Sequence, residues 1–374
     1  MAKKDWRVLV VNPGSTSTKI GLFDGEREVF SKTVDHDAAK LAEFPTVSDQ
    51  MPYRRDMILD ILKYEGIDLA SVDAFVGRGG GLLPLEGGTY RIDETLLHDA
   101  RVGANGVQHP AQLGSQIADE FARQTGKPSF VVNPPDTDEL CDEARMTGVA
   151  GVYRHVHLHA LNLKETAIRH ARSMGKRYDA CNFVVCHIGG GISVSAHRRG
   201  RMIDGNDIVG GEGPMTPTRC GSLPAVEVID YLKAGHSLDE AHKLCLKNGG
   251  FVSLCGTSDA REVQARAAEG DEAAARAWKA MTYQLCKWIG AMACALGGEV
   301  DGILLGGGMV HSDELVEAVR KNCGWIAPVT AYPGEFELEA MAAGADRVLD
   351  GEEEAKRYTG EPVWNGFPSA GSDR

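Results

Sequence analysis

The fold is decided by the stretch Val8-Leu-Val-Val-Asn-Pro-Gly-Ser-Thr-Ser-Thr-Lys19, which continues to Gly25. A β-branched, apolar run over 7–11 leads into a turn rich in glycine and hydroxyl groups, and a second apolar run covers 19–23. Because β-branched residues favour strands and Asp-Gly is a frequent hairpin turn, the pattern predicts strand, polar turn, strand and hairpin turn in succession.

The same order of strand and turn returns 175 residues later. The sequence predicts a strand over 183–187, a glycine turn over 189–191, a returning strand over 192–196 and a hairpin turn at Gly200. Asn12 then aligns with His187, and Gly25 with Gly200, without a gap. This spacing favours duplication over chance.

The remaining pattern alternates between helices and short buried strands, which is typical of an α/β protein. Expected helices cover 57–62, 111–123 and 277–296 and begin again at Ser312; expected strands cover 74–76, 129–132 and 302–305. A chain of 374 residues exceeds one ordinary core. We expect one domain of residues 1–152 with a returning segment of about 333–374, a second domain of 153–332, and an active-site cleft between them.

Composition narrows the class of partner. The net charge of −13 argues against nucleic acids and anionic membrane surfaces, which would repel the chain. The nine cysteines form no Cys-x-x-Cys pair, and the apolar run after Lys4 is too short for a signal peptide. No 18-residue apolar stretch occurs. We therefore expect a cytoplasmic protein with reduced thiols and neither membrane nor nucleic acid as a partner.

The first hairpin has the chemistry that a polyphosphate needs. Gly14 allows close approach of the backbone, Ser15 and Ser17 offer hydroxyl donors, and Lys19 offers a positive charge. Asn12 ends a buried strand and presents a neutral oxygen suited to Mg²⁺ or its waters. The alternative is a polar, Ser/Thr-rich hairpin that binds nothing.

The second hairpin replaces hydroxyl groups by bare backbone. His187 ends the strand, Gly189, Gly190 and Gly191 expose N–H groups that can cradle oxygens, and Ser193 adds a hydroxyl. The alternative is a glycine-rich β-turn beside a core histidine whose hydrogen bonds are satisfied.

A third glycine run, Gly306, Gly307 and Gly308, follows the strand over 302–305 and suits the flat approach of a nucleotide base or ribose. Two familiar nucleotide motifs are absent. Gly126-Lys127 precedes proline and Gly175-Lys176 precedes arginine, so neither forms a P-loop, and no G-x-G-x-x-G follows a strand.

Five motifs, in order, closely resemble those of the acetate/butyrate kinase family. They are Val8-Leu-Val-Val-Asn-Pro-Gly-Ser-Thr-Ser-Thr-Lys19, Gly77-Arg-Gly-Gly80, His159-Ala-Leu-Asn162, Val185-Cys-His-Ile-Gly-Gly-Gly-Ile-Ser193 and Pro217-Thr-Arg-Cys-Gly221. The resemblance runs from about residue 8 to 350. It implies duplicated ribonuclease-H-like domains of the sugar kinase, Hsp70 and actin superfamily, and a homo-oligomer.

The resemblance also implies catalytic roles. Arg78 and Arg219 fall on paired active-site arginines, although a lone loop arginine is otherwise more often a surface residue. His159 falls on a polar contact to the phosphoryl group in flight, and His187 of the second hairpin is expected beside it, where both would neutralise charge on that group.

The family places Mg²⁺ through water with a glutamate that matches Glu337, near Asn12, and the neighbouring Glu335 is an alternative match. His155 and His157 alternate with His159, but no carboxylate or cysteine is locally spaced to complete a zinc site.

The sequence departs from the family at one position. An aspartate normally ends the strand that here reads Phe130-Val-Val-Asn133. The amide of Asn133 can still coordinate, but it brings no negative charge to Mg²⁺. Asp136 or Asp138 could substitute, and the sequence leaves this choice open.

The implied reaction is ATP plus a small carboxylic acid giving ADP plus acyl phosphate, by in-line transfer with Mg²⁺ and without a strong general base. Acetate-specific relatives carry a bulkier aliphatic residue where this chain has Gly80. The missing side chain favours butyrate or branched acids over the alternatives acetate and propionate. A sugar kinase would need a carboxylate base, and an actin- or Hsp70-like ATPase a polymerisation insert or a peptide-binding domain.

Overall fold

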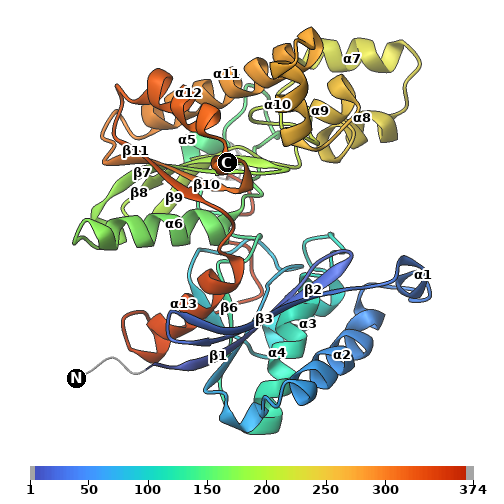
Figure 1. The fold of residues 1–374 in the computed structure, drawn as a ribbon, viewed down its shortest axis with the longest axis vertical. Coiled ribbons are helices and arrows are strands. Elements are labelled where there is room, and N and C mark those ends of the chain that lie inside the picture. Colours follow the sequence, from blue (N-terminus) through green and yellow to red (C-terminus); the bar gives the residue numbers. More distant parts are fainter. Residues whose placement is uncertain (1–4, 368–374) are drawn as a thin grey trace, which may run out of the picture. The chain divides into compact units, whose positions relative to one another are not determined.

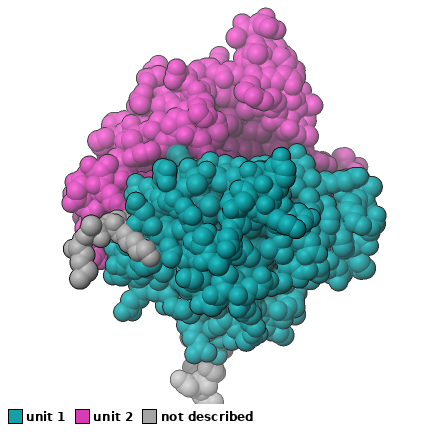
Figure 2. Space-filling view, turned by 60° about the horizontal axis from the view of Figure 1, so that its bottom comes forward, with its two compact units in different colours: residues 1–138, 336–374 teal, residues 139–335 magenta. Residues whose placement is uncertain are grey.

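The computed structural model describes residues 5–367, and these form two compact units. Unit 1 combines the residues up to Asp138 with those from Phe336 onward, and unit 2 comprises Glu139–Glu335 (Figure 2). Each unit is an α/β structure built around one sheet.

Unit 1 holds a seven-stranded sheet in the order β12-β5-β6-β4-β1-β2-β3. The strands are β1 (Arg7–Pro13), β2 (Ser17–Asp24), β3 (Arg27–Asp35), β4 (Ala74–Gly77), β5 (Thr89–Arg91), β6 (Ser129–Val132) and β12 (Lys356–Arg357). β1, β2 and β3 form an antiparallel meander, and β4 and β6 continue the sheet parallel to β1.

Helices cover both faces of this sheet (Figure 1). They are α1 (Ala38–Leu41), α2 (Met51–Tyr64), α3 (Glu94–Val102), α4 (Gln112–Thr125) and α13 (Glu337–Leu349), with short 3₁₀ turns at Ser48–Gln50 and Leu69–Ser71. Leu9 and Val11 alternate onto one face, where they join a core with Leu62 of α2 and Ile117 of α4. Helix α13 packs on β1 and β6.

Unit 2 holds a five-stranded sheet in the order β11-β10-β7-β8-β9. The strands are β7 (Asn182–Ile188), β8 (Ile192–Arg198), β9 (Arg201–Gly205), β10 (Gly302–Gly307) and β11 (Val329–Pro333). Alternation along β7 again divides the core. Val184 packs with Met281 and Leu315 on one face, and Phe183 packs with Leu163 on the other.

The helices of unit 2 pack on the two faces of its sheet (Figure 1). Helix α6 (Ala160–Ser173) covers one face, and α11 (Glu272–Ala295) and α12 (Asp313–Cys323) cover the other. The others are α5 (Asp142–Arg145), α7 (Ala225–Lys233), α8 (Leu238–Leu246), α9 (Gly250–Cys255) and α10 (Ala260–Ala268), with 3₁₀ turns at Tyr178–Ala180 and Gly308–His311.

The two units share one topology, which confirms the predicted duplication. In both, an antiparallel three-stranded meander is extended by two strands parallel to its first strand. The bounds of β1 and β7 differ by 175 residues at both ends. Gly25 and Gly200 have φ of 59° and 87°, values that favour glycine, so the same hairpin turn recurs.

The first boundary between the units lies earlier than the sequence-based division at 152. Glu139 is buried against unit 2, where its carboxylate accepts from Lys164 Nζ at 3.0 Å and from the Met202 N–H at 2.7 Å. Cys141 donates its N–H to the Ile203 carbonyl at 2.9 Å. These contacts assign the segment after Asp138 to unit 2. Among the described residues, no helix is long and apolar enough to cross a membrane.

Candidate active site

The first phosphate-type turn joins β1 to β2 in unit 1. Gly14 donates its N–H to the Ser17 carbonyl at 2.7 Å, which closes the turn. Asn12 lies opposite Lys19 in the antiparallel register, and Ser15 Oγ lies 3.3 Å from His109 Nε2. The turn therefore holds the predicted residues Asn12, Gly14, Ser15, Ser17 and Lys19 close together.

Arg78 directly follows β4 and lies against the first turn of α4. Its N–H donates to the Val11 carbonyl at 2.9 Å. Gly77 and Gly114 let helix and strand approach: a Cβ at Gly77 would lie 2.1 Å from the Gly114 oxygen, and one at Gly114 would lie 2.5 Å from the Arg78 nitrogen. The two glycines thus fix the position of the Arg78 backbone.

The Arg78 guanidinium is buried with unused hydrogen-bonding capacity. Burial lowers its pKa, while the charges of Glu337 and Asp136 oppose that shift. Its Nη1 is buried and has no hydrogen-bond partner within the described part of the chain. A buried donor of this kind is costly unless something accepts from it, so the arrangement suits an anionic ligand.

Asn12 and Glu337 meet, as the resemblance implies. Asn12 Nδ2 donates to Glu337 Oε2 at 2.8 Å, and Glu337 is the first residue of α13. Among residues 5–367, no group of three or more His, Cys, Asp or Glu could hold a metal by itself. One amide oxygen beside one carboxylate fits Mg²⁺, which keeps several waters and takes the rest of its ligands from phosphates.

Asn133, which stands where the family normally has an aspartate, has a structural role in this chain. Asn133 adopts φ of 38°, and its Oδ1 accepts from the Gly88 N–H at 2.7 Å. Asp138 is buried, and its N–H donates to the Leu85 carbonyl. Asp136 is also buried and accepts from Asn105, and of these three residues it alone raises the pKa of Arg78. Of the two candidate carboxylates, Asp136 is thus the one whose charge acts on Arg78.

Gly80 is buried beside the start of α4. A Cβ there would lie 3.2 Å from the Gln112 nitrogen and 3.3 Å from the Ala111 Cβ. The glycine therefore has a packing reason of its own, apart from any effect on a substrate pocket.

In unit 2, two predicted histidines stack on each other. The rings of His159 and His187 lie 4.0 Å apart between centroids, with 21° between their planes. Ser193 Oγ lies 2.8 Å from His159 Nδ1 and accepts from the His159 N–H at 3.2 Å. Ser193 thus orients His159 at the N-terminal end of α6.

Arg219 crosses the second glycine turn. A Cβ at Gly191 would lie 1.7 Å from Arg219 Nη1, so only glycine leaves room for the guanidinium. Thr216 and Thr218 donate from their hydroxyls to the Gly190 carbonyl at 2.7 and 3.0 Å. The predicted arginine, Arg219, therefore packs directly on the predicted glycine turn.

The Arg219 guanidinium resembles that of Arg78 in its electrostatics. Burial lowers its pKa, and the charge of Asp207 opposes that shift. Its Nε and Nη1 atoms are buried and have no hydrogen-bond partner among residues 5–367. Each unit therefore presents one arginine with donors that an anion could satisfy.

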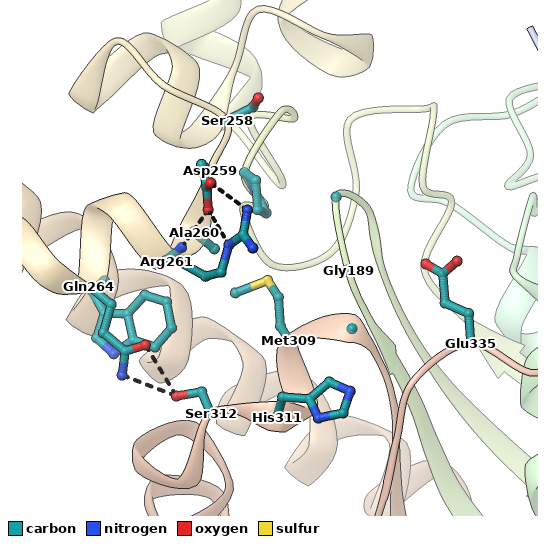
Figure 3. Close-up of a pocket in the computed structure, with 14 residues that line it drawn as sticks. Gly189, Ser258, Asp259, Ala260, Arg261, Gln264, Met309, His311, Ser312 and Glu335 are labelled. Carbon is teal, nitrogen blue, oxygen red and sulfur yellow. Dashed lines mark hydrogen bonds and ion pairs between the residues drawn. The ribbon is translucent and has the colours of Figure 1, made fainter. Parts of the chain in front are cut away.

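A pocket of about 710 Å³ adjoins the second glycine turn (Figure 3). It extends from Gly189 and Gly190 to Gly308, and its other lining residues are Pro217, Ser258, Asp259, Ala260, Arg261, Gln264, Trp278, Met309, His311, Ser312 and Glu335. Arg261 pairs with Asp259 at 2.7 Å, and Gln264 Nε2 donates to Ser312 Oγ at 3.1 Å. Met309 and Trp278 contribute apolar side chains to the lining, against which a base could pack.

Of the third glycine run, Gly308 lines this pocket, whereas Gly306 and Gly307 end β10 beside it. Gly307 has φ of 98°, and a Cβ there would lie 2.4 Å from the Ile188 oxygen. Sequence reasoning missed the pocket wall from α10, and it missed Arg54 behind the first turn. The sequence offers one signal for this wall, Asp259 before Ala260-Arg261. An aspartate at this place is a common helix N-cap and does not by itself indicate a pocket.

The two units together form a duplicated ribonuclease-H-like α/β fold, and solved kinases share this fold. Acetate kinase from Porphyromonas gingivalis superposes with a TM-score of 0.74 at 20% identity, covering 92% of this chain and 99% of that one. Acetate kinase from Entamoeba histolytica gives 0.73 at 16% identity, over 91% and 99%.

The particular family follows from sequence. A "Probable butyrate kinase" of Clostridium botulinum (strain Alaska E43 / Type E3) is 44% identical over 354 residues, which are 94% of this chain and 99% of that protein. The model of the acetokinase family matches residues 150–324. The chain belongs to the acetokinase family.

Proposed function

We propose that this protein transfers the γ-phosphoryl group of ATP to a short-chain carboxylate, butyrate, and so forms butyryl phosphate and ADP reversibly. The observation that carries the proposal is the pair of half-buried arginines, Arg78 and Arg219, each with buried donor atoms that lack a protein partner among the described residues. Such donors match the charge that must be neutralised on a transferring phosphoryl group and on a carboxylate.

The side chains divide the work of transfer. A carboxylate is already ionised and nucleophilic at neutral pH, so the site needs orientation more than a base. Arg78 and Arg219 would neutralise oxygens of the reacting groups, and His159, fixed by Ser193, would donate to the phosphoryl group beside His187. Asp136 would hold Arg78 in place through its charge.

Different residues would bind the nucleotide and the metal. Bound Mg²⁺ supplies charge neutralisation at phosphate oxygens, and Asn12 and Glu337 would hold its water shell. Ser15, Ser17 and Lys19 would contact the terminal phosphates. The pocket beside Gly308 would take the nucleoside.

The choice of butyrate rests on the relatives, since proteins named probable butyrate kinases match 94% of this chain at 44% identity. Gly80 is the proposed contributor to the longer acyl pocket. We further propose that the protein is cytoplasmic, which fits its nine free cysteines. We also propose that it is a homo-oligomer, and light scattering of the purified protein would measure the assembly.

Trapping the product with hydroxylamine tests this function. Purified protein with Mg²⁺ and ATP is incubated with acetate, propionate, butyrate, isobutyrate or glycerol, and the acyl hydroxamate is measured by colour. We expect the strongest signal with butyrate. No colour with any of the acids would contradict a carboxylate kinase, and acetate exceeding butyrate would contradict the substrate assignment alone.

A further inference from the structure

The turn between β1 and β2 is held from behind by a buried arginine. Arg54 belongs to α2 and has 0% of its surface exposed. Its Nη1 donates to the carbonyl oxygens of Gly14 at 2.9 Å and Ser17 at 3.2 Å, and to Thr18 Oγ1 at 3.1 Å. Its Nη2 reaches the Ser15 carbonyl at 3.4 Å. One side chain thus binds most of the turn.

This grip fixes the direction of the backbone dipoles. In a planar trans peptide the carbonyl of one residue points opposite to the N–H of the next. The carbonyls of Gly14 and Ser15 face Arg54, so the N–H groups of Ser15 and Thr16 point away from it. Successive N–H groups turned to one side form a concave site for an anion.

The charge of Arg54 is not neutralised by an ion pair within residues 5–367. Its remaining N–H groups donate to the neutral Gln50 Oε1 at 3.1 and 2.9 Å. Other arginines shielded from solvent have carboxylate partners. Buried Arg347 pairs with Glu353 at 3.1 Å, and half-buried Arg154 pairs with Glu212 at 2.8 Å. Burial without a carboxylate costs stability, so a compensating use is expected.

The positive charge is felt around the turn. Burial lowers the pKa of Arg54 to about 10, which leaves it charged at neutral pH. Burial lowers the pKa of His36 to about 4, with a further contribution from Arg54. The pKa of His109, which contacts Ser15, is lowered by burial, by Arg78 and by Arg54. The field of Arg54 therefore reaches the side of the turn that carries Ser15.

We propose that Arg54 is a positioning residue for phosphate. It shapes the turn over residues 14–18 from behind and supplies an uncompensated buried positive charge, so that the N–H groups of the turn receive the terminal phosphates of a nucleoside triphosphate. This inference rests on the proposed function for the identity of the anion. Arg54 does not touch the phosphate itself.

Binding of the β,γ-imido analogue of ATP with Mg²⁺, measured by calorimetry, tests the proposal, together with KM and kcat. Arg54→Met is expected to weaken analogue binding and raise the KM for ATP about tenfold, since the turn loses both its grip and its charge. The control is Arg347→Met, another buried arginine of unit 1, which is expected to lower the melting temperature without changing analogue affinity. Unchanged affinity in Arg54→Met, or an equal loss in Arg347→Met, would overturn the proposal.

If Arg54→Met does not fold, Arg54→Lys tests the positioning role instead. A lysine keeps the charge but lacks the planar fork that reaches the turn and Gln50 together. We expect analogue affinity below that of the wild type, and wild-type affinity in this variant would refute the positioning role. Because analogue binding needs no carboxylic acid, a wild type that fails to form acyl phosphate would refute the proposed function and leave this result intact.

Discussion

At the scale of single residues, Gly191 shows how tightly the second turn and Arg219 depend on each other. The guanidinium occupies the space where any side chain at 191 would begin. The glycine is therefore required less for its own flexibility than for the path of the arginine above it.

This contact predicts that Gly191→Ala acts like a mutation of Arg219. The added methyl group must displace the guanidinium, and a shift of about 1 Å in a catalytic group can cost about a hundredfold in rate. We expect kcat to fall by about that factor in both Gly191→Ala and Arg219→Ala, with the melting temperature nearly unchanged. Steady-state kinetics and thermal unfolding would measure both effects.

Gly290→Ala is the matched control, because a Cβ at Gly290 on helix α11 would meet nothing within 4 Å. It adds the same methyl group and should leave kcat unchanged. Wild-type kcat in Gly191→Ala would show that Arg219 has another path and would refute the argument.

His36 predicts a dependence of stability on pH. Burial, reinforced by Arg54 and opposed by Asp35, lowers its pKa from 6.5 to about 4. Between these two values the unfolded chain binds more protons than the folded one, so the free energy of unfolding falls as the pH drops from about 6.5 to 4. The slope from this group is at most about 1.4 kcal/mol per pH unit.

His36→Gln should flatten that slope, since glutamine does not titrate and can still accept from the Thr18 hydroxyl. Urea unfolding at several pH values between 4 and 7 would measure it. His98→Gln, on the exposed side of α3, should leave the slope unchanged. An unchanged slope in His36→Gln would contradict the shifted pKa.

Residue types in turns were predictable because phosphate chemistry demands glycine, hydroxyl and positive charge. Their partners were not. Arg54 stands in a helix whose sequence signals only an amphipathic surface, and its contact with the turn spans 40 positions along the chain. Such pairs depend on the tertiary structure, which local patterns do not encode.

At the scale of elements, the repeated hairpins were predictable because two-residue alternation and turn glycines are local signals. The meander strands β1 and β7 begin and end at equivalent positions. The segment over 139–152 was assigned differently, because Glu139 joins unit 2 through a buried ion pair with Lys164 that no local pattern indicates.

Helix α13 carries Glu337 and lies on β6 at a glycine. A Cβ at Gly344 would lie 2.4 and 2.6 Å from the two methyl groups of Val132 and 3.1 Å from its Cβ. Gly344→Ala should therefore lower the free energy of unfolding by about 1–3 kcal/mol, as overpacking does. Alanine's better helix propensity, about 1 kcal/mol, offsets only part of this.

Urea unfolding would measure the change, and Gly290→Ala in α11 should shift stability in the opposite direction. A displaced α13 should also weaken the contact of Glu337 with Asn12, so the Mg²⁺ concentration needed for half-maximal activity should rise. Equal or greater stability of Gly344→Ala would contradict the packing argument.

At the scale of the whole molecule, duplication gave each unit an equivalent sheet and a turn after its first strand, and the two copies then diverged. The first copy kept hydroxyls, Lys19 and a buried arginine behind the turn. The second exchanged Asn12 for His187 and leaves space above Gly191 for Arg219. Of the pocket beside Gly308 only the glycine run was predicted, because the other walls come from α10 and α11, which are distant from it in sequence.

Chain-length selection is the property of the whole enzyme that Gly80 tests most directly. A methyl group at Gly80 would press on Ala111 and Gln112 at 3.2–3.5 Å, a contact that small shifts can relieve. If Gly80 also borders the acyl chain, Gly80→Ala removes room for about one methylene, which is worth ~0.8 kcal/mol or about fourfold. We expect the ratio of kcat/KM for butyrate to that for acetate to fall by at least that factor, measured by hydroxamate formation. Thermal unfolding separates the two effects: an unchanged ratio with a lower melting temperature would assign Gly80 to the packing of α4 alone and place the butyrate preference on other residues.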